Sequence, residues 1–132
     1  MADAREQMVD DVRRYLAAGE RLVAGISEFI AMNSEALQDL EVGMSLTDSF
    51  RYRDSAGWSR RVSSLLHEFE ARRRETRSSV TVVLLEEGRS VTEVGRAFGV
   101  SHQLASRIVK GLPADTGEGS IDMGEGAVDT AD

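Results

Sequence analysis

The chain has 132 residues, a formal net charge of -7 and no cysteine. Its length suits one compact domain, or a small domain with a helical extension, and excludes a large enzyme core. The lack of cysteine excludes disulfide bridges, thiolate zinc sites and a cysteine nucleophile.

Charge is divided unevenly along the sequence. Residues 1–50 carry 4 basic and 10 acidic side chains, residues 51–110 carry 12 and 7, and residues 111–132 carry none and 6. Attraction to phosphate requires local positive charge, which the average value conceals. We therefore expect a basic functional segment between two acidic ones.

An all-α fold is predicted from the composition. Hydrophobic residues make up 41% of the chain and aromatic residues 5%, and the single proline, Pro113, lies near the end of the part expected to fold. The amino terminus lacks the features of a signal peptide, and no apolar run of ~18 residues would span a bilayer. We expect a cytoplasmic, nucleoid-associated protein without membrane contact.

The first predicted element is a long amphipathic helix over residues 4–32. Two apolar rows run along it: Met8, Val12, Tyr15, Gly19, Leu22, Ile26 and Phe29 form one, and Val9, Leu16, Val23 and Ile30 form the other. Together they make a face wider than a coiled-coil seam. Such a face must pack on later helices, on a second copy, or on both, and we expect a homodimer through residues 8–42.

Short elements are predicted next. Asn33 and Ser34 offer capping oxygens for a second helix over residues 35–42, which Gly43 ends. Residues 45–53 have the pattern of one or two further helical turns. A turn or cap is expected at residues 54–57.

A helix is predicted over residues 58–77 and another over residues 79–87, and fusion of the two is left open. Residues 80–85 are rich in β-branched side chains, but a strand is rejected because no partner strand exists and a glycine follows where a helix would stop. Trp58 is interpreted as a core anchor. The cluster Arg72–Arg74 is either a solvated helix face or a phosphate contact.

The following segment predicts two short helices joined by a turn. Ser90 and Glu93 fit a capping box at the start of the first helix, which ends at Gly99 because the turn requires a positive φ. Ser101 caps the second helix, over residues 102–110. The apolar core between these helices is expected to consist of Val94, Phe98, Val100, Ala105 and Ile108.

This segment resembles the helix-turn-helix superfamily over about 21 residues. The small residue Gly95 precedes the turn Gly99 by four positions, and Val100, Ala105 and Ile108 stand at the buried positions of the superfamily. With the preceding predicted helix added, the segment is similar to the three-helix unit of resolvase-type and transposase-type domains and of the promoter-reading region of sigma factors. The first 57 residues resemble no named family.

The resemblance implies that the second helix lies in the major groove of double-stranded DNA, with its first residues at the base edges. Gln103 is expected to pair with adenine and Arg107 with guanine, while Arg96, Ser101 and Lys110 are placed for phosphates. The full set of expected DNA-contacting residues is Arg96, Ser101, His102, Gln103, Ser106, Arg107 and Lys110.

The predicted function is sequence-specific DNA binding by a dimeric transcriptional regulator. Two alternatives share the motif: a sigma-like or anti-sigma-like adaptor that binds another protein, and an accessory factor of partition, recombination or transposition. No residue pattern supports catalysis or a cofactor. A metal site is not expected either, since His67 and His102 are far apart in the sequence and no cysteine accompanies them.

Three segments are predicted along the chain. Residues 1–57 form a helical module for dimerisation or partner binding, and residues 58–112 form a linker helix and the DNA-binding domain. Residues 113–132 form an acidic, glycine-rich tail, which we expect to be disordered because it buries too little apolar surface to offset chain entropy. The tail either solvates the chain or competes with DNA for the basic segment.

Overall fold

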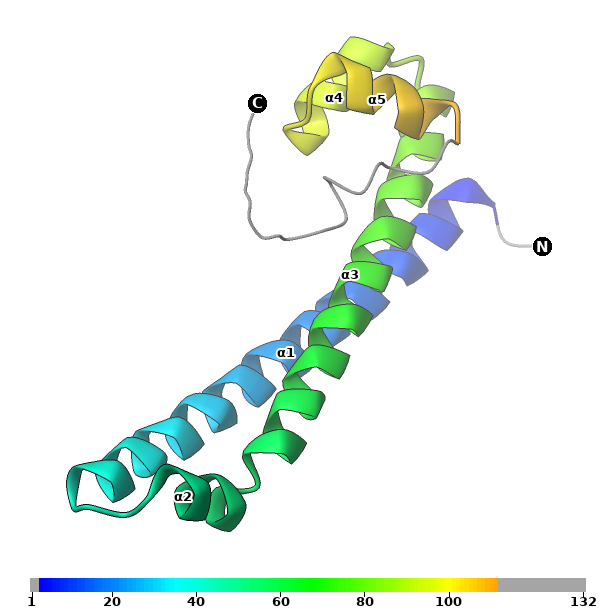
Figure 1. Ribbon diagram of the computed structural model, residues 1–132. Coiled ribbons are helices and arrows are strands. Elements are labelled where there is room, and N and C mark those ends of the chain that lie inside the picture. The colour runs from blue at the N-terminus through cyan, green and yellow to red at the C-terminus, as the bar shows by residue number, and fades with distance from the viewer. Residues whose placement is uncertain (1–2, 112–132) are drawn as a thin grey trace. The chain divides into compact units, whose positions relative to one another are not determined.

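The computed structural model describes residues 3–111, which form five α-helices and no strand (Figure 1). The helices are α1 (Ala4–Glu41), α2 (Leu46–Arg53), α3 (Ser55–Glu86), α4 (Val91–Phe98) and α5 (His102–Val109). The prediction of an all-α fold is confirmed over this range. The acidic tail predicted to be disordered, residues 113–132, lies outside the described residues.

The described chain divides into two compact units. Residues 13–72 form the first, here called the hairpin unit, which holds most of α1, all of α2 and the first part of α3. Residues 3–12 and 73–111 form the second, here called the terminal unit, which includes α4 and α5. The boundary expected at residue 57 does not coincide with this division, because residue 57 lies in the first turn of α3.

Helix α1 is longer than the sequence pattern predicts. The expected break at Asn33 and Ser34 and the separate helix over residues 35–42 are wrong, because α1 continues to Glu41. The Asn33 side-chain amide donates a hydrogen bond of 2.9 Å to the Phe29 carbonyl, one turn earlier in the same helix. An asparagine bonded in this way lies inside a continuing helix and does not cap a new one.

Glycines end α1, α3 and α4 in the same manner. At the end of α4, Gly99 has a φ of 67° and the Val100 amide donates to the Gly95 carbonyl at 3.0 Å. This Schellman motif satisfies the last carbonyls of the helix and favours glycine because φ is positive. Equivalent bonds surround Gly43 and Gly88, so the three predicted helix stops are confirmed.

Helix α2 begins after a capping serine, and the residue that ends it also caps the start of α3. The Ser45 hydroxyl accepts a hydrogen bond of 3.1 Å from the Asp48 amide. Asp54 ends the helix with a φ of 53°, a conformation that aspartate tolerates better than most residues. Its carboxylate accepts from the Gly57 amide at 3.3 Å, so the same residue also caps the start of α3.

Helix α3 is continuous from Ser55 to Glu86, so the two helices predicted over its length are one. Residues 80–85 are helical, which confirms the rejection of a strand. Buried hydroxyls within α3 bond to carbonyls: Thr81 donates to the Arg77 carbonyl at 2.7 Å. Buried hydroxyl groups that are hydrogen-bonded in this way destabilise the fold very little.

In the hairpin unit, α1 and α3 run antiparallel (Figure 1). The rings of Tyr15 and Phe69 lie with their centroids 5.1 Å apart. A methyl group added at Gly19 would lie 3.4 Å from the Phe69 ring, and one at Gly25 would collide with the Leu65 side chain. The two glycines therefore allow the close approach of α1 and α3.

Three ion pairs join α1 to α2 and α3 and are here called the ion-pair ladder. They are Arg21–Glu68 (2.5 Å), Glu28–Arg61 (3.4 Å) and Glu35–Arg53 (2.6 Å). Their members on α1 are spaced by seven residues, close to two helical turns, so the pairs follow one side of the helix.

The two predicted apolar rows of α1 differ in exposure. Tyr15, Leu22 and Phe29 of the first row are half-buried. In the second row Leu16, Val23 and Ile30 are exposed, and Leu37 continues that row at the same spacing of seven residues. These four residues are called the outer row below. One apolar face of α1 is thus used inside the chain and a second is left at its surface.

Candidate nucleic-acid interface

The start of α4 is fixed by the predicted capping box. The Ser90 hydroxyl accepts from the Glu93 amide at 3.2 Å, and the Glu93 carboxylate accepts from the Ser90 amide at 2.9 Å. The bond from the Ser90 amide, followed by the charge of Arg89, holds the pKa of Glu93 below its ordinary value of 4.5. Glu93 is therefore ionised at neutral pH, next to the positive end of the helix dipole.

Helices α4 and α5 pack closely against each other. Val94 of α4 and Ala105 of α5 are fully buried. A methyl group built at Gly95 would lie 3.1 Å from the Ala105 Cβ atom and 3.3 Å from the Val100 carbonyl oxygen. The approach of the helices therefore depends on a glycine at position 95, as the sequence pattern predicts.

The start of α5 is capped and exposed. The Ser101 hydroxyl accepts a hydrogen bond of 3.1 Å from the Leu104 amide, which fixes the first turn. His102 and Gln103, in that turn, are exposed. The arrangement holds two polar side chains, each able to donate and accept hydrogen bonds, at the beginning of a short rigid helix.

The seven residues predicted to contact DNA are not equally accessible. Five are exposed: Arg96, Ser101, His102, Gln103 and Lys110. Ser106 and Arg107 are half-buried, and the Nε atom of Arg107 is buried. Ser106 and Arg107 are therefore less accessible than the other five residues, and their role in DNA contact stays a prediction.

The segment around α4 and α5 is locally basic. Residues 88–111 contain four basic side chains and one acidic side chain, against a formal charge of -7 for the whole chain. Arg89 is one of the four, lies partly exposed 3.7 Å from Glu93, and was missed by the sequence prediction. The signal for including it would be a basic residue directly before the N-cap of a helix that the resemblance places near the DNA backbone.

The arginine cluster preceding this segment is only partly solvated. Arg72 and Arg73 are half-buried, and Arg74 is exposed. A uniformly solvated helix face does not describe the cluster. Its role in phosphate contact stays a prediction.

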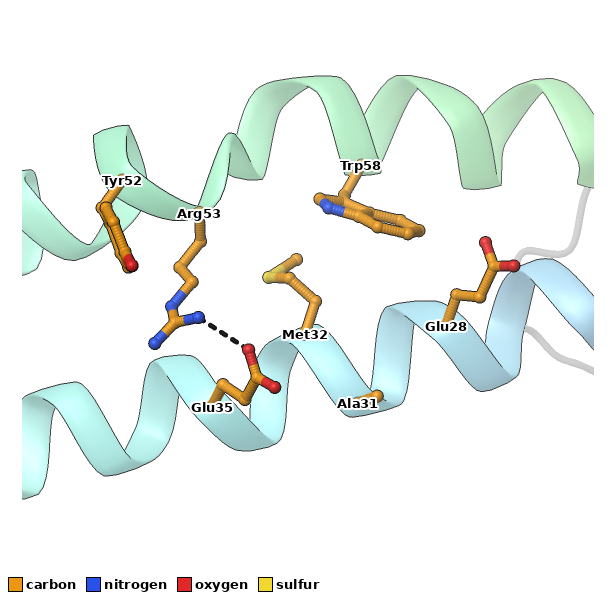
Figure 2. Close-up of a pocket in the computed structure, with 7 residues that line it drawn as sticks. All are labelled: Glu28, Ala31, Met32, Glu35, Tyr52, Arg53 and Trp58. Carbon is orange, nitrogen blue, oxygen red and sulfur yellow. Dashed lines mark hydrogen bonds and ion pairs between the residues drawn. The ribbon is translucent and has the colours of Figure 1, made fainter.

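A groove of about 550 Å³ lies in the hairpin unit (Figure 2). Its lining consists of Glu28, Ala31, Met32, Glu35, Tyr52, Arg53 and Trp58. In Figure 2, Trp58 points from α3 toward α1 and Met32 points from α1 toward α3. Trp58 is half-buried, which agrees with its interpretation as an anchor. Both carboxylates of the groove belong to the ion-pair ladder, which favours a structural role for it.

Arg53 joins α2 to the end of α1 at one edge of this groove. Its guanidinium donates two hydrogen bonds of 2.9 Å to Asp39 and one of 2.6 Å to Glu35. The bonds from Arg53 hold the pKa of Asp39 below its ordinary value, and Ser49 adds a further bond at 3.3 Å. Tyr52 places its ring centroid 4.8 Å from the same guanidinium.

Residues 3–111 contain no group of three or more metal-ligating side chains, and none of their helices is long and apolar enough to cross a membrane. No protein-family model, no curated protein and no solved structure matches this chain.

Proposed function

We propose that the chain is a sequence-specific DNA-binding protein, a dimeric transcriptional regulator in which α4 and α5 are a helix-turn-helix and α5 reads the major groove. The observation that carries the proposal is the combination of a close α4–α5 contact with an exposed, capped first turn on α5. A recognition helix must present its first residues to base edges while its other face is held rigidly. The last part of α3 supplies the third helix of the unit.

Gln103 is the leading candidate for reading a base. Its amide has the donor and acceptor geometry that matches adenine in the major groove, and it is exposed. His102 lies beside it. Arg107 is a weaker candidate than its sequence position suggests, because the residue is half-buried and its Nε atom is buried.

Contacts with the phosphate backbone of DNA are assigned to the basic side chains around the two helices. Arg96 follows on α4 and Lys110 caps the end of α5, and both are exposed. Such residues position a protein on DNA and make its affinity depend on salt. Arg89 joins this set.

Pairing of two chains through residues 8–42 is part of the proposal. A single helix-turn-helix buries little DNA-facing surface, and two such units on half-sites about one helical turn apart gain affinity and specificity. The exposed apolar residues of α1 supply a surface for pairing.

The role of Gln103 is tested by the substitution Gln103→Ala. DNA fragments that bind the full chain are first selected from a random pool at a stated salt concentration. On the selected site, Gln103→Ala is expected to lose ~1–3 kcal/mol of binding free energy and to relax preference at one base pair. Gln7→Ala, which removes an exposed glutamine from α1 outside residues 8–42, serves as the control and leaves binding unchanged. Equal binding by both variants would remove α5 from the recognition role.

An adaptor function is the second candidate, and the exposed outer row of α1 favours it. In that case the amino-terminal helices bind another protein and the chain alone binds DNA poorly. The same selection experiment separates the two functions, because an adaptor enriches no sequence from the pool. A regulator binds its selected site in the nanomolar range.

A further inference from the structure

The outer row of α1 is an exposed apolar strip within the hairpin unit. Leu16, Val23, Ile30 and Leu37 are 62%, 67%, 59% and 57% exposed. They follow one another at intervals of seven residues on a single helix. Isolated exposed apolar residues are common on proteins, whereas a contiguous strip marks an interaction site.

A repeat of seven residues indicates what kind of partner the strip fits. An ideal α-helix drifts relative to a seven-residue repeat, so such a row stays on one face only when the helix supercoils with another helix. The internal face of α1 already packs in the hairpin unit. The outer row therefore has the spacing of a second helical seam.

The residues beside the outer row permit close approach. Ala24 and Ala31 lie on one side of it, and Ser27 and Ser34 lie between its members. All four are small, uncharged and exposed. Glu20, at the equivalent position between Leu16 and Val23, is charged and exposed. A helix that packs here therefore meets small, uncharged side chains beside most of the outer row and a carboxylate near its Leu16 end.

We infer that a second copy of this chain covers the outer row, with the two α1 helices antiparallel. The inference rests on the proposed function for its role and deepens it by naming the face through which the dimer forms. A two-fold interface uses the same patch on both copies, and a neutral apolar strip complements itself. Setting Leu16 against Leu37 of the other copy also brings the Arg13 end of one helix to the Glu41 end of the other, so opposite charges meet.

The size of the strip suits this occupant. Four large side chains that are more than half exposed approach the largest apolar patches of monomeric proteins, about 300–600 Å². Pairing two such strips with their small neighbours buries roughly 1,200 Å² in total, near the lower limit of stable protein interfaces.

The mass of the full chain, measured by sedimentation equilibrium without DNA over a range of concentrations, tests the inference. The wild type is expected to associate to twice its monomer mass of 14.4 kDa. Val23→Glu combined with Ile30→Glu is expected to weaken association at least tenfold while circular dichroism shows unchanged helix content. Phe50→Glu, at a residue that is 53% exposed on α2 and outside residues 8–42, is the control. A wild-type mass of one chain at every concentration would overturn the inference.

Oxidative crosslinking provides a second test that needs no charged substitution. The chain has no cysteine, so Leu16→Cys and Leu37→Cys each introduce a single thiol. In the antiparallel dimer a mixture of the two variants forms a disulfide-linked pair faster than either variant alone. Crosslinking of each variant with itself overturns the antiparallel alignment, and no crosslinking in any sample overturns the interface.

The two proposals fail separately. If the chain is a monomer but Gln103→Ala still loses binding to the selected DNA, the dimer is wrong and DNA recognition by α5 stands. If the chain is a dimer but enriches no DNA sequence, the assignment of the outer row to the dimer interface stands and the DNA-binding function is wrong.

Discussion

Glu93 holds the beginning of α4 through a hydrogen bond that its negative charge strengthens. Its carboxylate accepts from the Ser90 amide, and that bond and nearby Arg89 lower its pKa from 4.5. A carboxyl group with a lowered folded-state pKa stabilises the fold above its unfolded-state pKa. The contribution is lost as the pH falls through the folded value.

Glu93→Gln is therefore expected to lower the thermal midpoint at neutral pH. Glutamine keeps an acceptor for the Ser90 amide but lacks the charge. The difference in thermal midpoint between the variant and the wild type is therefore largest above pH 4.5 and becomes smaller as the pH falls below that value. Melting curves of both proteins across this range measure the effect. A difference that stays constant with pH would show that the charge of Glu93 does not act.

Single residues also show where sequence reasoning fails. Asn33 has the chemistry of a helix cap, but its amide bonds back to Phe29 and the helix continues. Arg107 has the spacing of an exposed residue, but its Nε atom is buried. In both cases the surroundings in the folded chain decide how the side chain is used, and a spacing pattern does not contain them.

At the scale of elements, α4 and α5 pack closely at Gly95, where an added side chain would be tightly confined. Gly95→Val adds bulk against Ala105 and the Val100 carbonyl and is expected to destabilise the fold by ~1–3 kcal/mol. Ala97→Val makes a β-branched residue at an exposed position of the same helix and is expected to cost less than about 0.5 kcal/mol. Urea unfolding monitored by circular dichroism compares them. Equal losses would mean that the close approach is unimportant.

The predictable elements are those whose signals are local. The bounds of α4 and α5 follow from Ser90, Gly99 and Ser101, each of which bonds within five residues along the chain. The candidate DNA-contacting face follows from the same bounds, which is why five of its seven predicted residues are exposed. The full lengths of α1 and α3 were not predicted, because packing between distant segments overrides weak breaks in the sequence pattern.

For the whole molecule, the separation of charge predicts how DNA binding responds to salt. Although the chain is acidic overall, the segment over residues 88–111 is basic. If the chain binds DNA as proposed, a few side chains are expected to govern the release of counterions. Lys110→Ala and Arg96→Ala are each expected to reduce the slope of log affinity against log salt concentration by about 1, without changing base preference.

Arg60→Ala is the control for these two variants. Arg60 is exposed on α3 in the hairpin unit and is expected to leave the salt slope unchanged. Titrations of the selected DNA site at several salt concentrations give the slopes. If Lys110→Ala and Arg96→Ala matched the control, the phosphate contacts would have to come from elsewhere in the chain.

The ion-pair ladder favours the observed alignment of the hairpin over alignments shifted by seven residues. Apolar side chains repeated every seven residues tolerate a slip of one repeat, since each would meet another apolar side chain. A slip in one direction sets Arg21 opposite Arg61, and a slip in the other sets Glu28 opposite Glu68. Either misalignment places like charges together at the centre of the hairpin. Exposed ion pairs add little to the stability of the native fold. They can still favour it by raising the free energy of the shifted alignments that would otherwise compete with it.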